Sequence, residues 1–87
     1  MKRNIVYQRK EYVVYSARCG YVAHNTRKAF EDGHTHFDSL ETAKMVIDWC
    51  VNKKMPPRTS RYMLISLLRL TRDYKYQNRL KNSLYNK

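Results

Sequence analysis

The apolar residues of this chain change their spacing near residue 38, and this change sets the class of fold. Before it, runs of β-branched and aromatic residues at 5–7 and 12–15 are separated only by a short polar stretch, which predicts antiparallel strands. After it, apolar residues recur every three or four positions, as in amphipathic helices. Because 87 residues suffice for one core only, we predict a single α+β domain, with strands in 1–37 and helices in 38–87.

The strand region predicts an antiparallel β-meander of two to four strands. Gly20 breaks the second apolar run and suits a turn residue with positive φ, so a third strand is expected to start after it. Residues 25–31 are ambiguous, because they could extend this third strand. Asp32 and Gly33 form a typical turn sequence, and a last short strand is expected at 34–37.

A first helix over 38–54 is expected to cover the meander. Asp38 or Ser39 is a natural N-cap, and Glu41 stands in the capping-box position relative to Asp38. The two prolines at 56–57 stop the helix. The residues expected to face the sheet share one broad side of this helix: Leu40, Ala43, Val46, Ile47, Cys50 and Val51.

Met45 and Trp49 lie four residues apart on the opposite side of the first helix. We expect the pair to pack beneath a second helix. The alternative is that the pair forms a surface for a partner protein.

A long, basic second helix is predicted over 58–87, starting near Thr59 or Ser60. Past Tyr74 its apolar stripe weakens, so we expect the end of the chain to pack weakly or to order on binding. The stripe consists of Met63, Leu64, Leu67, Leu70 and Tyr74. Five basic residues fall within about 60° of the direction opposite to it: Arg61, Arg69, Arg72, Lys75 and Arg79.

The charge of the chain favours a polyanionic partner. Lys and Arg number 18 against 7 Asp and Glu, for a net charge of +11, and eight of the basic residues but only one acidic residue, Asp73, lie in 58–87. A concentration of positive charge of this kind is typical of nucleic-acid binding. The alternative is a solvated helix face, although like charges three and four residues apart repel one another.

The candidate nucleic-acid site therefore lies on the second helix, with a second patch near the N-terminus. A row of guanidinium groups suits phosphates along a backbone, and Tyr76 within the row could stack on an unpaired base. The pattern favours backbone contacts over base readout and leaves RNA or DNA open. The candidate residues are Arg61, Arg69, Arg72, Lys75, Tyr76 and Arg79 on the helix, with Lys2, Arg3, Arg9 and Lys10 in the second patch.

Three histidines are the only residues that suggest catalysis or a metal site. His34 and His36 would share one face of a strand, and His24 could join them as a metal ligand or as an acid or base of a ribonuclease. Their spacing matches no catalytic or metal-binding motif, and no P-loop or nucleophile elbow is present. We therefore predict no enzymatic activity, no metal and no cofactor.

The cysteines and the apolar runs bear on the compartment. Cys19 and Cys50 are too few for a disulfide scaffold or a thiolate zinc site, which favours two reduced thiols in a cytoplasmic protein. No apolar run approaches the roughly 20 residues that span a bilayer, so no membrane association is expected.

The segment at 33–49, GHTHFDSLETAKMVIDW, resembles a pattern of small phage and bacterial proteins in which a β-meander ends in an aromatic residue and a helix then covers the sheet. The whole chain is similar in size and character to small basic early proteins of T4-like phages, such as the RNA-binding inhibitor of a ToxN-type RNase toxin. This resemblance implies a phage-encoded protein that acts in the host cytoplasm.

Together, these features predict a small, non-enzymatic RNA-binding protein. The resemblance implies a host-takeover or anti-defence factor, which could inhibit an RNase toxin through bound RNA. The expected partners are RNA and a host nuclease or toxin, and self-association stays open. The alternatives are a DNA-binding transcriptional regulator and a small metal-independent endoribonuclease.

Overall fold

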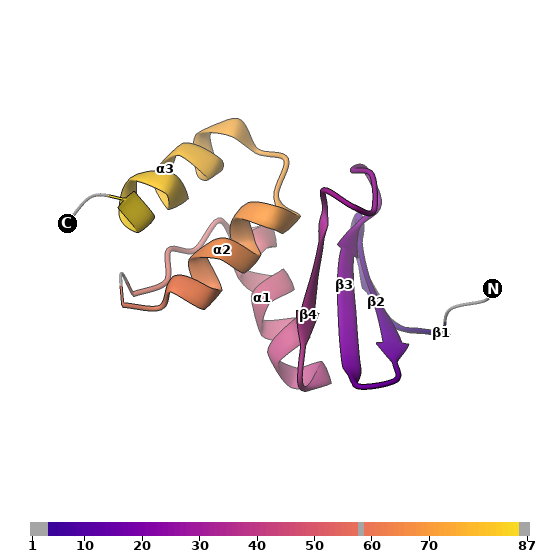
Figure 1. Ribbon diagram of the computed structural model, residues 1–87. Helices are drawn as coiled ribbons and strands as arrows, with labels where there is room; N and C mark the ends of the chain where they lie inside the picture. Colours follow the sequence, from indigo (N-terminus) through magenta and orange to yellow (C-terminus); the bar gives the residue numbers. More distant parts are fainter. Residues whose placement is uncertain (1–3, 58, 86–87) are drawn as a thin grey trace.

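The computed structural model describes residues 4–57 and 59–85, in which a four-stranded sheet is followed by three helices. All three helices lie on one side of the sheet (Figure 1). The α+β class is therefore confirmed. The elements are β1 (Asn4–Arg9), β2 (Tyr12–Ala17), β3 (Gly20–Asn25), β4 (His34–Phe37), α1 (Leu40–Asn52), α2 (Arg61–Leu70) and α3 (Tyr74–Tyr85).

The sheet is an antiparallel meander with the strand order β1-β2-β3-β4. Gly20 has a φ of 139°, as expected of a turn glycine, and a Cβ at this position would lie 2.5 Å from the carbonyl oxygen of Phe37. The third strand ends at Asn25, so residues 26–33 form the loop to β4 and do not extend β3.

The helix-facing side of the sheet meets both α1 and α2 in one core. Val14 and Ala23 are directly paired across β2 and β3, and both are fully buried beneath the helices. Four of the α1 residues expected to face the sheet are fully buried, namely Ala43, Val46, Ile47 and Cys50. The prediction of one covering helix was too simple, because α2 also contacts β3 and β4 and adds Leu64, Leu67 and Leu70 to the core.

Helix α1 begins and ends with defined caps. Of the two predicted N-caps, Ser39 is the one used, because its hydroxyl accepts a 3.1 Å hydrogen bond from the amide of Thr42. Lys53 follows the last turn in the left-handed conformation, with a φ of 56°.

The predicted long C-terminal helix is wrong, because the chain turns at residues 71–73 and divides it into α2 and α3. Thr71 has an extended ψ of 148°, and its hydroxyl accepts a 3.1 Å hydrogen bond from the amide of Asp73. The Asp73 carboxylate then accepts a 3.0 Å hydrogen bond from the amide of Tyr76. Asp73 thus caps a new helix, which folds back beside α2 (Figure 1).

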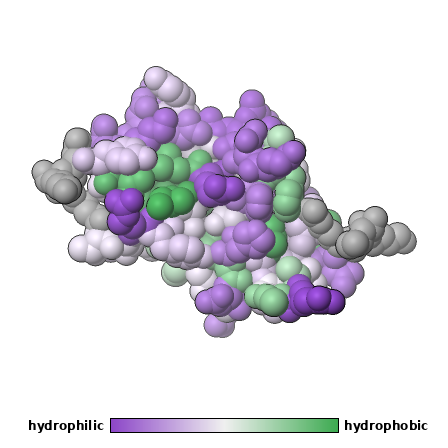
Figure 2. All heavy atoms as spheres, viewed as in Figure 1, coloured by the Kyte–Doolittle hydropathy of each residue, from purple (hydrophilic) through white to green (hydrophobic). Residues whose placement is uncertain are grey.

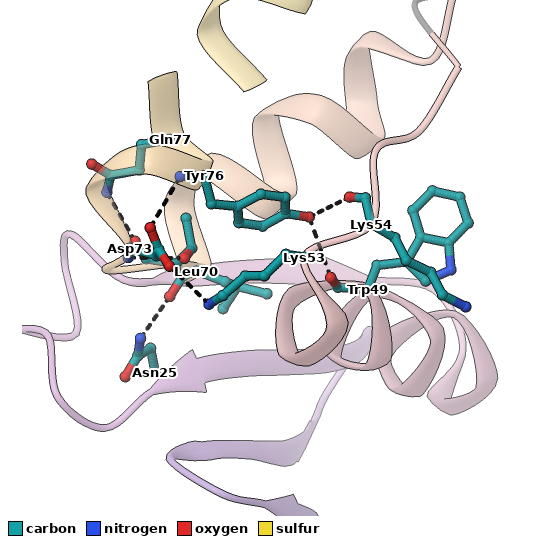
Figure 3. A network of polar contacts seen from close by, with 9 residues as sticks. Asn25, Trp49, Lys53, Lys54, Leu70, Asp73, Tyr76 and Gln77 are labelled. Carbon is teal, nitrogen blue, oxygen red and sulfur yellow. Dashed lines mark hydrogen bonds and ion pairs between the residues drawn. The ribbon is translucent and has the colours of Figure 1, made fainter. Parts of the chain in front are cut away.

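The end of α2 is fixed by side chains from two other elements. Asn25, at the end of β3, is fully buried and donates a 2.7 Å hydrogen bond to the carbonyl of Leu70 (Figure 3). The Gln77 amide, in α3, donates a 2.9 Å hydrogen bond to the carbonyl of Thr71. Carbonyls at a helix C-terminus have no partner within the helix, so these bonds satisfy them and hold the turn in place.

Tyr76 connects α3 to the end of α1. Its side chain is only 2% exposed, and its hydroxyl donates to the carbonyl of Lys54, with the carbonyl of Trp49 as a second acceptor 3.3 Å away (Figure 3). Burial raises the pKa of the Tyr76 hydroxyl, which therefore stays a hydrogen-bond donor.

Met45 and Trp49, predicted to pack together beneath a second helix, have different surroundings. Trp49 is partly buried and packs against the core, and its backbone carbonyl lies 3.3 Å from the Tyr76 hydroxyl of α3. Met45 is 43% exposed, so its predicted place beneath a helix is wrong. Tyr74, predicted in the apolar stripe, is 72% exposed, because the turn before it changes the phase of the helix.

Candidate nucleic-acid interface

A groove of about 470 Å³ lies between α2 and α3. Figure 2 shows it as a hydrophobic patch enclosed by hydrophilic side chains, over the part of the molecule where α2 and α3 lie in Figure 1. The turn at 71–73 creates the groove, because it folds α3 back beside α2. The groove is lined by Asp32, Arg61, Ile65, Leu68, Arg69, Gln77, Lys81, Leu84 and Tyr85.

Three cations line this groove. Arg61 and Arg69 lie eight residues apart on one side of α2, and Lys81 faces them from α3. Asp32, in the loop before β4, is the only acidic residue among the lining side chains. The groove therefore presents an excess of positive charge together with an apolar floor.

Arg69 is positioned by the edge of the sheet. Its Nε donates a 2.8 Å hydrogen bond to the carbonyl of His34 in β4. This bond uses one of the five N–H groups of the guanidinium, which leaves the terminal nitrogens for an anion. The Tyr62 hydroxyl of α2 likewise donates to the carbonyl of His36, so α2 covers the free edge of β4.

Lys28 adds another cation beside the groove. Its ammonium donates to the carbonyls of Arg69, at 3.0 Å, and Thr71, at 3.4 Å, and so helps to cap α2. The pKa of Lys28 is lowered, chiefly because burial disfavours its charged form, although nearby Asp32 opposes this effect. The positive charges of Arg69 and Arg72 lower it further, which marks this corner as rich in cations.

The predicted row of five basic residues is divided by the turn. Arg61 and Arg69 line the groove, whereas Arg72, Lys75 and Arg79 are exposed but do not line it. Lys75 and Arg79 lie four residues apart on α3, and Lys81 is turned about 200° from Arg79 around that helix. The helical wheel of one continuous helix therefore places on one face basic residues that lie on two different surfaces of the protein.

Tyr76 cannot stack on a base, and the prediction that it does so is wrong. Its ring lies in the core, and its hydroxyl is bonded to the end of α1. The exposed aromatic ring that does line the groove is Tyr85, which is 71% exposed.

The predicted second patch is not a continuous surface in the described residues. Arg9 forms a 2.8 Å ion pair with Asp48 of α1, which lowers the pKa of the Asp48 carboxyl. Lys10 is exposed in the β1–β2 turn, with a φ of 55°. Lys2 and Arg3 lie outside the described residues.

Sequence reasoning missed Lys28, Lys81 and Tyr85. Lys28 was placed in a segment that could have extended β3, and its role depends on contact with a helix 41 residues further on. On one continuous helix, Lys81 and Tyr85 would lie on the side of the apolar stripe and away from the basic row. The Thr71-x-Asp73 sequence, a turn residue followed by an N-cap, is the signal that would have revealed the new helix.

The three histidines do lie together, on the face of the sheet away from the helices. His24 and His34 are directly paired across β3 and β4, and the His36 ring lies 5.2 Å from that of His34. Phe30 stacks on His34 at 4.2 Å between ring centroids. Within the described ranges, no group of three or more His, Cys, Asp or Glu side chains is arranged to hold a metal ion.

Hydrogen bonds from two of these rings hold the loop before β4. The Nε2 of His24 lies 2.9 Å from the carbonyl of Lys28, and the Nδ1 of His34 bonds to the carbonyl of Phe30. Because a carbonyl oxygen only accepts, each of these ring nitrogens carries a proton. These bonds assign a structural role to His24 and His34.

The cysteines are both free, with Cys19 exposed and Cys50 in the core. Burial raises the pKa of the Cys50 thiol to about 12, so this thiol stays protonated and is a poor nucleophile. In 4–57 and 59–85, no helix has both the length and the hydropathy to cross a membrane.

Comparisons with known proteins add no family to this description. No family model matches the chain, and no curated protein or solved structure matches it either. The function is therefore inferred from the groove between α2 and α3.

Proposed function

We propose that this chain is a non-enzymatic RNA-binding protein that uses the groove between α2 and α3. The observation that carries the proposal is the convergence of Arg61, Arg69 and Lys81, from two helices, on one groove with a single acidic residue. Guanidinium groups bind phosphate oxygens through paired hydrogen bonds, and Lys adds a point charge. Such a groove suits a nucleic-acid backbone.

An exposed tyrosine in the groove favours RNA over DNA. The Tyr85 ring lines the groove and is 71% exposed. Aromatic rings at a basic surface stack on unpaired bases, which RNA presents in loops and single strands. The resemblance to small early proteins of T4-like phages extends the proposal to a phage-encoded anti-defence factor in the host cytoplasm. Such a factor would inhibit an RNase toxin through bound RNA.

A metal-independent ribonuclease is the second candidate, and one observation favours it. The His34 and His36 rings are adjacent, and Arg69 is bonded to the carbonyl of His34. A ribonuclease needs an acid, a base and a cationic clamp for phosphate. One observation counts against a ribonuclease. The His34 Nδ1 is already hydrogen-bonded to the carbonyl of Phe30, so this nitrogen is not free to act on a substrate.

The proposal is tested by purification without nuclease treatment, followed by titration of labelled RNA and of duplex DNA over a range of salt concentrations. We expect co-purified RNA and tighter binding of RNA than of DNA. The logarithm of the binding constant should fall linearly with the logarithm of the salt concentration. A protein that purifies without nucleic acid and binds neither probe at low salt would exclude the proposal. Tighter binding of duplex DNA would favour a transcriptional regulator.

A further inference from the structure

The floor of the groove is apolar, which phosphate binding does not require. Ile65 and Leu68 of α2 and Leu84 of α3 line it between the cations. Ile65 is 41% exposed, although Leu64, Leu67 and Leu70 of the same helix are fully buried. Phosphates gain nothing from apolar surface, so this floor suits the flat, weakly polar face of a base.

Given the proposed RNA-binding function, on which this step rests, we propose that the groove holds an unpaired base of single-stranded RNA. The base lies on the floor formed by Ile65, Leu68 and Leu84, and its flanking phosphates lie on the cations. The protein therefore selects single strands over duplexes.

Tyr85 and Gln77 give the groove two further features that suit a base. The Tyr85 ring lines the groove and is 71% exposed, so it offers a platform for stacking. Gln77 also lines the groove, and its amide nitrogen donates to the carbonyl of Thr71. This bond fixes the side chain, whose amide oxygen can accept a hydrogen bond from a base N–H group.

Two other occupants fit the groove less well. An A-form duplex turns its bases inward and presents backbone and 2′-hydroxyl groups, so the apolar floor would have no partner. An acidic amphipathic helix of a protein would need a row of apolar anchors over two turns. The groove offers three aliphatic side chains among five polar or charged ones, which matches a base with a polar edge better.

The test compares a short labelled RNA without self-complementarity, alone and annealed to its complement, by fluorescence anisotropy at fixed salt. Tyr85→Ala and Ile65→Thr remove the platform and part of the floor. Tyr74→Ala is the matched control, because Tyr74 lies on the same helix and is 72% exposed but does not line the groove. Circular dichroism and the melting temperature show whether each variant is folded.

We expect the single strand to bind at least tenfold more tightly than the duplex. Tyr85→Ala and Ile65→Thr should each weaken single-strand binding by about five- to tenfold, with the salt dependence unchanged, because no phosphate contact is lost. Tyr74→Ala should change it by less than twofold. Equal binding of the duplex, or no effect of the two groove variants, would overturn the single-strand inference while the RNA-binding function stands. If the wild-type protein binds no RNA at all, both the single-strand inference and the proposed RNA-binding function are overturned.

Discussion

The amide of Tyr76 donates a 3.0 Å hydrogen bond to the carboxylate of Asp73, and this bond starts α3. Asp73 also forms a 3.5 Å ion pair with Lys53, at the end of α1 (Figure 3). The residue therefore fixes both the point where the chain reverses and the position of α3 against α1. Because the groove exists only when α3 folds back beside α2, the cap at Asp73 supports the candidate site indirectly.

Replacement of Asp73 tests this link and has a defined pH dependence. The pKa of Asp73 is lowered, first by the hydrogen bond from Tyr76 and then by the charge of Lys53, against an opposing effect of burial. A carboxyl group with a lowered pKa stabilises the fold above its unfolded value of about 3.9, and the contribution disappears as the pH falls through the folded value. Asp73→Asn keeps a cap but cannot titrate, so its melting temperature should be below that of the wild type at pH 7 and should approach it near pH 2. A constant difference between the two proteins at all pH values would contradict this role.

Removing the hydroxyl of Tyr76 should destabilise the domain without touching the groove. Tyr76→Phe keeps the buried ring but leaves the carbonyls of Lys54 and Trp49 without their donor. We expect a loss of about 1–2 kcal/mol in the free energy of unfolding, measured by urea denaturation. Tyr74→Phe, at an exposed position of the same helix, is the control and should be neutral. If Tyr76 instead contacted RNA, its replacement would change affinity more than stability.

Asn25→Asp should be tolerated only at low pH, where the new carboxyl group is protonated and uncharged. The Asn25 amide donates to the carbonyl of Leu70 inside the protein, whereas a carboxylate in its place could only repel that oxygen. Asn25→Asp should therefore cost on the order of 3 kcal/mol at pH 7 and regain part of this as the pH falls and the carboxyl becomes protonated, since a protonated carboxyl can donate. Unfolding measured between pH 4 and 7 gives the answer. Equal stability of the variant and the wild type at pH 7 would show that this bond is unimportant.

The histidine cluster should be dispensable for RNA binding. His36→Gln and His34→Gln should each change RNA affinity by less than a few-fold, because neither residue lines the groove. Neither the wild type nor the variants should cleave labelled RNA. The decisive observation against this view is cleavage that persists in EDTA and disappears with one histidine replacement, which would make the basic groove the phosphate clamp of a ribonuclease.

The strands and α1 were predictable because their signals are local. Gly20 and Ser39 act through a turn and a cap, and the alternation of side chains in each strand depends only on neighbouring residues. The surface on α2 and α3 was not predictable in the same way. A helical wheel adds about 100° per residue without interruption. The turn at 71–73 interrupts the helix, so the wheel of a continuous helix does not apply to α3. As a result, Tyr76 lies in the core and Tyr85 lines the groove.

The position of the groove depends on contacts between residues far apart in sequence. Asn25 and Lys28 bond to the end of α2 across more than forty residues, and no local pattern indicates either bond. The excess of positive charge in the last third of the chain could be predicted from composition. Which of these charges share one surface could not, because that depends on how α3 lies against α2.

The most direct test of the account compares two triple variants that remove the same charge. One carries Arg61→Gln, Arg69→Gln and Lys81→Gln in the groove, and the other carries Arg72→Gln, Lys75→Gln and Arg79→Gln outside it. RNA affinity is measured for both as a function of salt concentration, with melting temperatures as a check on folding. We predict that the groove variant binds at least tenfold more weakly, with a log–log salt slope reduced by about two units, because each phosphate contact to a single strand contributes about 0.7. The other variant should stay within about threefold of the wild type. An equal or larger loss in the variant outside the groove would contradict the account.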